Sequence, residues 1–358
     1  MEQKERVTVK DIANRLQISP GTVSKALSGK KGISASMRRR ICDTAAEMGY
    51  HVNRTAQSLA RKTIRIGIAY PAVWAQYYDQ LIRGVNRALD SLRDYNVIGV
   101  FRTFSGLYET GELSAIVEDF TREQIDAVIL SPGAITDCDT LLRQLREAEI
   151  PCFLVGNDFD PSLRTACIRV DAVLAGKLAG EMMNYLTPEN AQILAFIGDG
   201  NLTEHAEKLQ GFRAELQGGR HLAGCFETQD DPVIAAEMIQ KALRDFPQIR
   251  GVYIATSNSV PVCEILSRQA ETAHVRIIAT DLFPELIPYV RRRQIHAVVF
   301  QNPEEQGEQA VLRCYEYITK HEMVDQCLIT PSVLLRNSIL AMQQALPRRT
   351  SSEDDRKQ

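Results

Sequence analysis

Short apolar runs alternate with amphipathic stretches along the chain from residue 64 onward. The runs are rich in Val, Ile and Leu, as is typical of buried parallel strands. Eight of them predict strands at residues 64–70, 95–101, 126–132, 151–157, 191–198, 251–256, 275–281 and 296–302. Helix-period stretches lie between most of these runs, for example at 78–92 and 172–186. This alternation predicts a doubly wound α/β fold, and about 280 residues of this kind suit two lobes better than one.

Residues 8–29, TVKDIANRLQISPGTVSKALSG, carry a different pattern, that of two short amphipathic helices joined by a tight turn. Thr8 is suited to cap the first helix, with Asp11 as its reciprocal partner. Ser19 is suited to cap the second, and Pro20 to occupy its first position. The polar face of the second helix carries Gly21, Thr22, Ser24 and Lys25. Small, hydroxylic and cationic groups at the start of a second helix predict a helix-turn-helix that reads DNA in the major groove.

Two further segments follow before the first strand. Ser34 opens a third helix, for which Gly49 is the expected stop. Residues 51–63, HVNRTAQSLARKT, contain helix formers but are too few to hold a helix alone in water. If this segment folds on DNA, Leu59 is its one bulky apolar side chain able to wedge between base steps. A plain linker with an exposed leucine is the alternative, and composition alone favours it.

The charge of the chain is distributed unevenly. Residues 1–65 contain 14 Lys and Arg against 5 Asp and Glu, whereas the remaining 293 residues contain 28 against 40. A polyanion is attracted to such a basic head and repelled by the acidic body, which predicts salt-dependent DNA binding. A solvated basic face would explain the charge alone, but not the helix pattern beside it.

Composition bounds the class of protein. With 358 residues and 44% hydrophobic content, the chain is long enough for more than one domain. No apolar run approaches the roughly 18 residues that span a bilayer, and MEQKERVTVK lacks the apolar core of a secretion signal. The eight cysteines form no CxxC pair and no metal-ligand spacing with His, so we expect mostly buried, reduced thiols. These features predict a cytoplasmic protein without cofactor, metal or membrane association.

Polar and aromatic residues gather where the predicted strands end, the edge of a parallel sheet at which ligands bind. They are Tyr77, Asn157, Asp158, Asp199, Asn258, Asp281 and Gln301. None of them forms a nucleophile–base pair, and the chain has no GxxxxGKS, GxSxG or paired-acid motif. We therefore expect a binding site and no enzyme activity.

The motifs VTVKDIANRLQISPGTVSKALSG and NRTAQSLARKTIRIG resemble those of the lactose-repressor (LacI/GalR) family of bacterial transcription regulators. The body is similar to the sugar-binding proteins of the periplasm. The resemblance implies a helix-turn-helix headpiece at 1–50, a hinge at 51–63, and a two-lobed effector-binding and dimerisation domain at 64–345. The remaining segment, 346–358, is polar and charged, which predicts a disordered tail. The first lobe would comprise about 64–166 and 302–327, and the second about 167–301 and 328–345.

The resemblance also implies which residues contact DNA. Leu59 would intercalate at the centre of a palindromic operator. Lys25 stands where many members carry Arg, and an ammonium group reads guanine less rigidly than a guanidinium group. The full set of expected DNA-binding residues is Thr8, Pro20, Gly21, Thr22, Ser24, Lys25, Asn53, Arg54, Gln57 and Leu59.

Segments such as AQYYDQLIRGV, TSNSV, IIATDLFPE and AVVFQNPEEQG are similar to those that hold a sugar in the periplasmic proteins. The resemblance implies effector contacts from Tyr77, Tyr78, Asn157, Asp158, Lys208, Asn258, Asp281 and Gln301. The chain departs from the family at Lys208, which replaces a common Arg. It also departs at Ser259 and Ala134, each of which replaces a carboxylate. These departures leave the identity of the effector open.

Several candidates have simpler interpretations. The two tyrosines could be ordinary half-buried aromatics, and Asp281 could merely cap the next helix. Trp74 could line the mouth of the cleft or anchor the preceding loop. We interpret Asp171 as an N-cap and His205 as a solvent-facing loop residue.

Taken together, these patterns predict a homodimeric transcription regulator, a repressor that binds a pseudo-palindromic double-stranded DNA operator. Its effector would be a sugar, a polyol or a sugar-derived molecule between the lobes, and lobe closure would change the separation of the hinge segments. The sign of the coupling is not predicted, so the effector could induce or co-repress. The alternative is a transport or sensory sugar-binding protein without a DNA function, against which the basic head argues.

Overall fold

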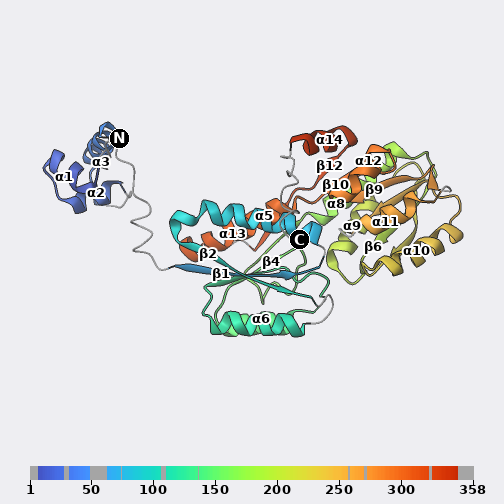
Figure 1. The fold of residues 1–358 in the computed structure, drawn as a ribbon, viewed down its shortest axis with the longest axis horizontal. Coiled ribbons are helices and arrows are strands. Elements are labelled where there is room, and N and C mark those ends of the chain that lie inside the picture. Colours follow the sequence, from blue (N-terminus) through green and yellow to red (C-terminus); the bar gives the residue numbers. More distant parts are fainter. Residues whose placement is uncertain are drawn as a thin grey trace, which may run out of the picture. The chain divides into compact units, whose positions relative to one another are not determined.

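The computed structural model describes residues 7–27, 32–48, 63–73, 75–105, 110–135, 137–256, 259–269, 272–321 and 325–345. These residues form two units, a helical unit before residue 49 and a larger α/β unit from Thr63 onward (Figure 1). Several sequence predictions lie outside the described residues, namely those for Gly49, Asn53, Arg54, Gln57, Leu59, Trp74, Asn258 and the tail at 346–358.

The helical unit consists of α1 (Val9–Leu16), α2 (Pro20–Leu27) and α3 (Ala35–Glu47). The predicted caps are confirmed. The backbone N–H of Thr8 donates to the Asp11 carboxylate at 2.7 Å, and the Asp11 N–H donates back to the Thr8 hydroxyl. The Ser19 hydroxyl accepts from the N–H of Thr22 at 3.1 Å, and Ser34 caps α3. The apolar stripes meet in one small core made of Ile12, Ala13, Val23, Ala26, Ile41 and Ala45.

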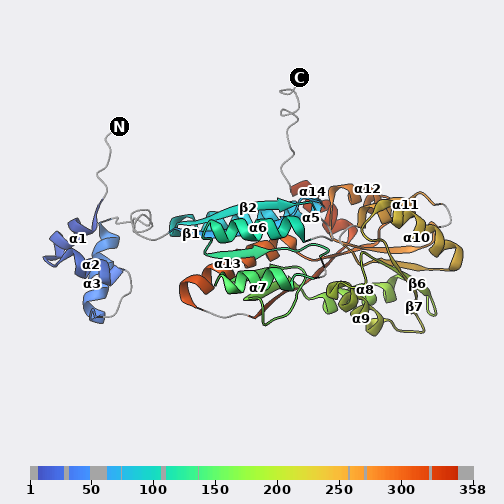
Figure 2. The ribbon, with the colours of Figure 1, turned by 90° about the horizontal axis from the view of Figure 1, so that it is seen from below.

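The first sheet of the larger unit is parallel throughout. Its strands, in spatial order, are β11 (Gln326–Ile329), β5 (Ala166–Val170), β4 (Cys152–Val155), β3 (Ala127–Leu130), β1 (Ile64–Pro71) and β2 (Val97–Phe104). Helices α5 (Ala75–Ser91) and α13 (Pro303–Lys320) cover one face (Figure 1). Helices α6 (Gly111–Arg122) and α7 (Asp139–Glu147) cover the other, over an apolar core (Figure 2). A short 3₁₀ turn, η1 (Arg93–Tyr95), precedes β2.

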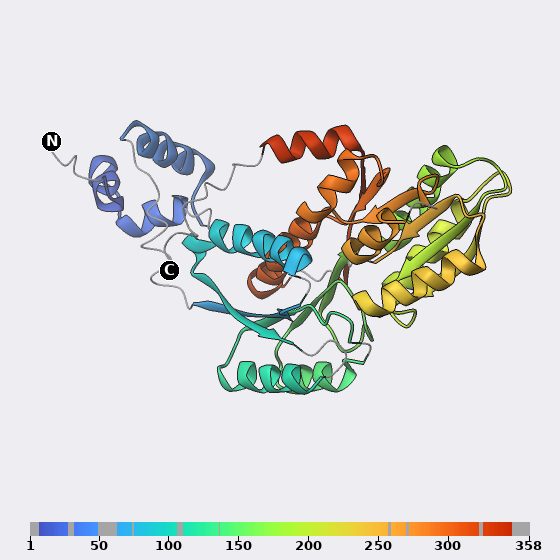
Figure 3. The same cartoon turned by 45° about the vertical axis from the view of Figure 1, so that its right-hand side comes forward.

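The second sheet has the order β12 (Ser332–Leu334), β10 (Ala297–Phe300), β9 (Arg276–Thr280), β8 (Gly251–Ile254), β6 (Gln192–Ile197) and β7 (His221–Glu227), and β12 alone is antiparallel to its neighbour. Alternate residues of β9 face opposite layers, with Ile278 towards one and Ile277 and Ala279 towards the other. The first layer is α8 (Ala172–Leu186) and α9 (Thr203–Glu215). The second contains α10 (Pro232–Asp245), α11 (Ser259–Ser267), η3 (Pro284–Leu286), α12 (Ile287–Arg291) and α14 (Arg336–Ala345) (Figures 2 and 3).

All eight predicted strands are present, but the sequence did not predict β5, β7, β11 and β12. Three of these four strands lie at sheet edges. Edge strands are covered less completely than central ones, so they need fewer apolar residues and give a weaker pattern. Strand β5 is internal, but Arg169 interrupts its apolar run.

The chain passes between the two sheets three times, after β5, β10 and β11. These crossings bind one another, because the Asp171 N–H donates to Ile329 O and Asn302 Nδ2 donates to Thr330 O, both at 2.9 Å. Asp171 also caps α8, as predicted. The expected lobe boundaries at 166/167 and 327/328 fall inside β5 and β11. Both strands belong entirely to the first sheet, so the crossings begin only after Val170 and Ile329.

Helices α8 and α9 pack with no room between them. A Cβ atom on Gly176 would lie 2.0 Å from Lys208 O, and one on Gly211 would lie 2.0 Å from Val173 O. Such distances are well inside van der Waals contact, so only glycine allows this approach. Helix α9 is thereby fixed against the sheet, and so is its first turn, which contributes to the site described next.

Candidate functional site

The predicted DNA-contacting residues of the second helix lie together on α2. Gly21, Ser24 and Lys25 are exposed, as is Pro20, and Thr22 is half-buried. The Thr22 hydroxyl lies 2.8 Å from the Ser19 hydroxyl, within the cap of the helix. Thr8 is exposed at the start of α1 and belongs to that helix's capping box. The start of α2 therefore presents a small, polar and cationic surface of the kind that enters a major groove.

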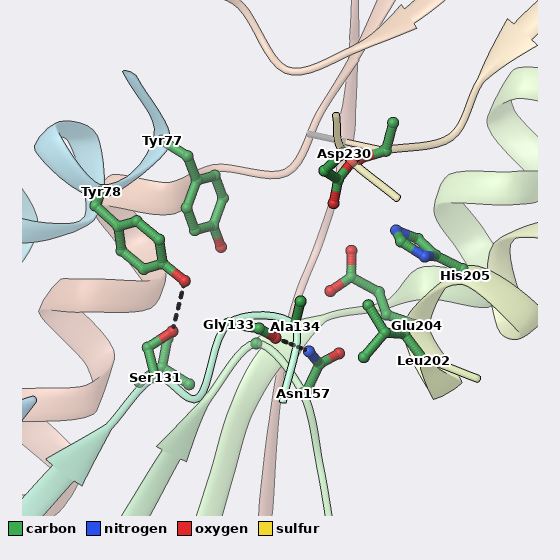
Figure 4. Close-up of a pocket in the computed structure, with 13 residues that line it drawn as sticks. Tyr77, Tyr78, Ser131, Gly133, Ala134, Asn157, Leu202, Glu204, His205 and Asp230 are labelled. Carbon is green, nitrogen blue, oxygen red and sulfur yellow. Dashed lines mark hydrogen bonds between the residues drawn. The ribbon is translucent and has the colours of Figure 1, made fainter. Parts of the chain in front are cut away.

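A pocket lies between the two lobes of the larger unit, and together with the open solvent at its mouth it comprises about 580 Å³ (Figure 4). Both lobes contribute side chains to it. The first lobe provides Tyr77, Tyr78, Ser131, Gly133, Ala134 and Asn157. The second lobe provides Leu202, Glu204, His205, Asp230 and Thr256. A ligand held here would contact both lobes at once, as in other ligand sites between domains.

Two tyrosines on α5 form the aromatic wall of the pocket. The rings of Tyr77 and Tyr78 meet edge to face, with centroids 5.2 Å apart and an interplanar angle of 90°. Their hydroxyls contact first-lobe groups, since Tyr77 donates to Gln306 Oε1 and Tyr78 contacts Ser131 Oγ, each at 3.3 Å. Burial raises the pKa of both phenols, so they stay protonated. The rings are thus fixed in place as apolar surfaces.

Asn157 supplies an oriented acceptor on the same side. Its Nδ2 donates to Gly133 O at 2.5 Å. Because a carbonyl oxygen can only accept, this bond fixes the orientation of the amide. Its Oδ1 is buried without a hydrogen-bond partner in the described part of the chain, and it faces the second-lobe side chains in Figure 4.

The first turns of α9 provide a buried charged cluster on the opposite wall. The Lys208 side chain is fully buried, and its Nζ donates to Glu204 and, at 3.4 Å, to Ala255 O. Burial alone would raise the pKa of Glu204, but the charge and hydrogen bond of Lys208 outweigh it and lower the pKa. Burial and Lys208 lower the pKa of His205, which favours its neutral form.

Asp230 enters the pocket from a strained loop after β7. Gln229 and Asp230 both have positive φ angles, 50° and 51°. Residues other than glycine rarely adopt this conformation, which costs on the order of 1–3 kcal/mol each. Thr256 Oγ1 donates to Asp230 Oδ1 at 2.7 Å. Burial raises the pKa of this carboxyl. Strain and burial of a charged group are common at functional sites.

Only some of the predicted effector residues lie together. Tyr77, Tyr78 and Asn157 line the pocket, whereas Asp158 and Lys208 are not among its lining residues. Both of these side chains are engaged elsewhere. Asp158 accepts two hydrogen bonds from the buried Arg164, at 2.6 and 2.8 Å, and Lys208 lies behind Glu204.

Asp281 and Gln301 are also absent from the pocket lining, and they bind each other. The Asp281 carboxylate is fully buried and accepts from the Gln301 backbone N–H at 2.9 Å and from its Nε2 at 2.7 Å. The expected cap of the next helix is not its role, because Phe283 occupies the N-cap position of η3. Asp281 instead holds the end of β10, immediately before the chain crosses between sheets.

Most of the lining residues were not predicted as site residues, among them the titratable Glu204, His205 and Asp230. The interpretation of His205 as a solvent-facing loop residue is wrong, since it lies buried on α9 with its Nδ1 2.8 Å from Asp199 O. The segment EHAEK gives no local sign of this burial, which arises from the close packing of α8 and α9. Asp230 lies in the segment TQDD (228–231), whose consecutive polar residues would at most have indicated a turn.

Comparison with known proteins defines the family. Residues 66–322 match the model of the periplasmic binding protein domain, and residues 8–53 match that of the lacI family of bacterial regulatory proteins. Catabolite control protein A of Priestia megaterium is 24% identical over 257 residues, which cover 70% of this chain and 74% of that protein. The HTH-type transcriptional regulator GntR of Pseudomonas aeruginosa is 23% identical over 262 residues, which cover 71% and 72% of the two chains.

Solved structures show the same fold in the larger unit. A glucose-galactose binding protein from Geobacillus stearothermophilus aligns with a TM-score of 0.67 at 20% identity, covering 77% of this chain and 99% of that one. A transporter solute binding protein from Bacillus halodurans with bound myo-inositol aligns with a TM-score of 0.67 at 16% identity, covering 79% and 98%.

The helices in the described part of the chain include none that is long and apolar enough to cross a membrane. The two family matches together cover both units, the helix-turn-helix before residue 49 and the two lobes that follow. The chain belongs to the lacI family of bacterial regulatory proteins, and it is a DNA-binding transcription regulator with a domain of the periplasmic binding protein type.

Proposed function

We propose that this regulator is a homodimeric repressor whose affinity for a pseudo-palindromic operator is controlled by a small polyhydroxylated effector, a sugar, a polyol or a molecule derived from one. The observation that carries this proposal is the pocket lined from both lobes by aromatic rings and hydrogen-bonding groups. Aromatic faces stack on the C–H bonds of a sugar ring, and polar side chains at the rim bind its hydroxyls. Proteins of the same fold hold glucose, galactose or myo-inositol.

DNA recognition is proposed for the start of α2 and for the hinge. Pro20, Gly21 and Lys25 would contact base edges, and Thr22 and Ser24 would contact phosphates. From the segment outside the described residues, Leu59 would insert into the minor groove, flanked by Asn53, Arg54 and Gln57. Thr8 would contribute at the start of α1.

Coupling between the effector pocket and the DNA-binding residues requires that the two lobes can adopt two different relative arrangements. Arg169 of β5, in the first lobe, pairs with Glu207 of α9, in the second. Gln80 of α5 donates to Leu282 O across the same boundary at 3.1 Å. An effector that adds contacts to both walls favours the arrangement in which these bonds form, and that shift would change how the two hinge segments of a dimer approach each other.

The proposal is tested by selecting duplexes from a random pool with the full chain and measuring their affinities. We expect a sequence with two inverted half-sites to emerge. Lys25→Gln should change which variants of that sequence bind, because a side chain at a base edge affects specificity at one position. A uniform loss over all variants would place Lys25 on a phosphate. Failure to enrich any sequence would contradict the proposed DNA function.

A further inference from the structure

The polar side-chain atoms that face the pocket are predominantly hydrogen-bond acceptors. Asn157 Oδ1 is buried, oriented and without a partner in the described part of the chain. Glu204 and Asp230 contribute carboxylates to the opposite wall (Figure 4). Most of the side-chain donors are directed to protein groups, because Thr256 donates to Asp230, Tyr77 donates to Gln306, and the Tyr78 and Ser131 hydroxyls share one hydrogen bond. A complementary ligand must therefore supply most of the donors.

His205 adds a further acceptor. Its Nδ1 lies 2.8 Å from Asp199 O and 3.3 Å from the Asp199 backbone N, and the shorter contact, to a carbonyl oxygen that can only accept, favours the neutral tautomer with the proton on Nδ1. Nε2 is then the unprotonated nitrogen of a side chain that lines the pocket. An acceptor at this position matches a hydroxyl or an ammonium group of a ligand, and it repels a phosphate or carboxylate oxygen.

The charge on the second-lobe wall has the same consequence. Glu204 and Asp230 bring two carboxyl groups and Lys208 brings one ammonium group, while none of the described lining residues is Arg or Lys. Lys208 lies behind the wall, with its Nζ on Glu204 and Ala255 O. An anionic ligand would thus face two carboxyl groups and no lining cation in a partly desolvated site, where charge repulsion is strong.

We infer that the pocket selects a polyhydroxylated ligand without an anionic group, and that Asp230 and Glu204 accept hydrogen bonds from its hydroxyl or ammonium groups. This inference rests on the proposed function and narrows it. Phosphorylated sugars and sugar acids are excluded as effectors, whereas uncharged sugars, cyclitols and amino sugars are admitted. The tyrosine rings of the first lobe provide an apolar face for the ligand, and the acceptors of the second lobe bind its hydroxyls.

A matched panel tests this inference on the full chain. Thermal shift and calorimetric titration are run at 0.15 M salt, roughly physiological ionic strength, with glucose, glucosamine, glucuronate and glucose 6-phosphate. The corresponding galactose and mannose derivatives, myo-inositol and an inositol phosphate complete the panel. We expect binding only among the uncharged and amino members. Asp230→Asn should weaken that binding at least tenfold, and Glu237→Gln, which removes an exposed carboxylate from α10, should leave it unchanged.

Each other result is informative. Binding of a phosphate or carboxylate derivative that Asp230→Asn leaves unchanged or strengthens would overturn the inference while leaving the proposed function intact. Binding of an uncharged member that Asp230→Asn does not affect would remove Asp230 from the site and also overturn it. The unfolding transition of each variant verifies that the variant is folded. If no member of any class binds, the proposed sugar-like effector is wrong, and the inference fails with it.

Discussion

The ammonium group of Lys208 is completely buried against the carboxylate of Glu204, one turn earlier on α9. This pair stands directly behind the pocket wall, so it fixes the position of a carboxylate that we expect to bind ligand. A buried pair offers little net stabilisation relative to an apolar substitute, but breaking it leaves an uncompensated charge.

Lys208→Met should therefore reduce the free energy of unfolding by about 3–5 kcal/mol at neutral pH. Without Lys208, burial raises the pKa of Glu204, so the penalty should shrink as the pH falls and the carboxyl takes up a proton. Chemical denaturation at pH 5 and pH 7 measures the difference. Arg268→Met is the matched control, because Arg268 pairs with Glu264 on the surface, and it should cost less than about 1 kcal/mol. Equal losses from the two variants would contradict this assignment.

Asp230 should destabilise the ligand-free protein at neutral pH. Burial raises the pKa of its carboxyl, so the folded state binds this proton more tightly than the unfolded state does. Stability from this group is present at low pH and decreases as the pH rises from about 3.8, the ordinary value, through the folded-state pKa. Asp230→Asn, which cannot ionise, should unfold at a higher temperature than the parent at pH 7 while losing ligand affinity. A lower melting temperature at that pH would show that the ionised carboxylate stabilises the fold.

A substitution at Gly21 distinguishes an effect on folding from an effect on DNA contact. A Cβ atom on Gly21 would have only Ser19 Oγ nearby, at 3.8 Å, so the helical unit has room for alanine. Gly21→Ala should leave stability unchanged or raise it by up to about 1 kcal/mol. If the bare backbone at this position approaches the base edges, the same variant should bind the selected operator at least tenfold more weakly. Unchanged affinity in a filter-binding or anisotropy titration would mean that position 21 does not approach DNA.

Asp281→Ala should destabilise the protein rather than act as a clean ligand-site variant. It removes the acceptor of two buried Gln301 donors and places alanine at φ 59°. Together these effects should cost at least about 2 kcal/mol in denaturation experiments. Asp281→Asn tolerates this backbone conformation and keeps one acceptor, so its loss should be smaller. Parent-like stability of the alanine variant would show that this contact does not hold the end of β10.

The sequence was sufficient to predict the elements that are stabilised by local contacts or formed by fully apolar runs. The capping box of Thr8 and Asp11 and the buried runs such as β3 and β4 are properties of neighbouring residues, and they were predicted. The edge strands β7 and β12 were not, since half-covered strands need no continuous apolar run.

The site was predictable only where it follows strand ends. Asn157 is the last residue of one predicted strand, Tyr77 lies in the first turn of the helix that follows another, and parallel topology brings those strand ends together. Glu204 and His205 depend instead on how closely α9 approaches α8, and Asp230 depends on two consecutive positive φ angles. Neither feature has a signature within a few residues of sequence, so the residues of the second-lobe wall could be identified only from the structure.

The most direct test of the account titrates a selected operator and a random duplex of equal length with the full chain, with and without the best panel ligand, and follows anisotropy. We expect the operator to bind at least about 10³-fold more tightly than the random duplex. Saturating ligand should change operator affinity by about 5- to 150-fold, and Asp230→Asn should need at least tenfold more ligand to reach half of this change. Equal affinity for the two duplexes, or an operator affinity that does not respond to a ligand filling the pocket, would contradict it.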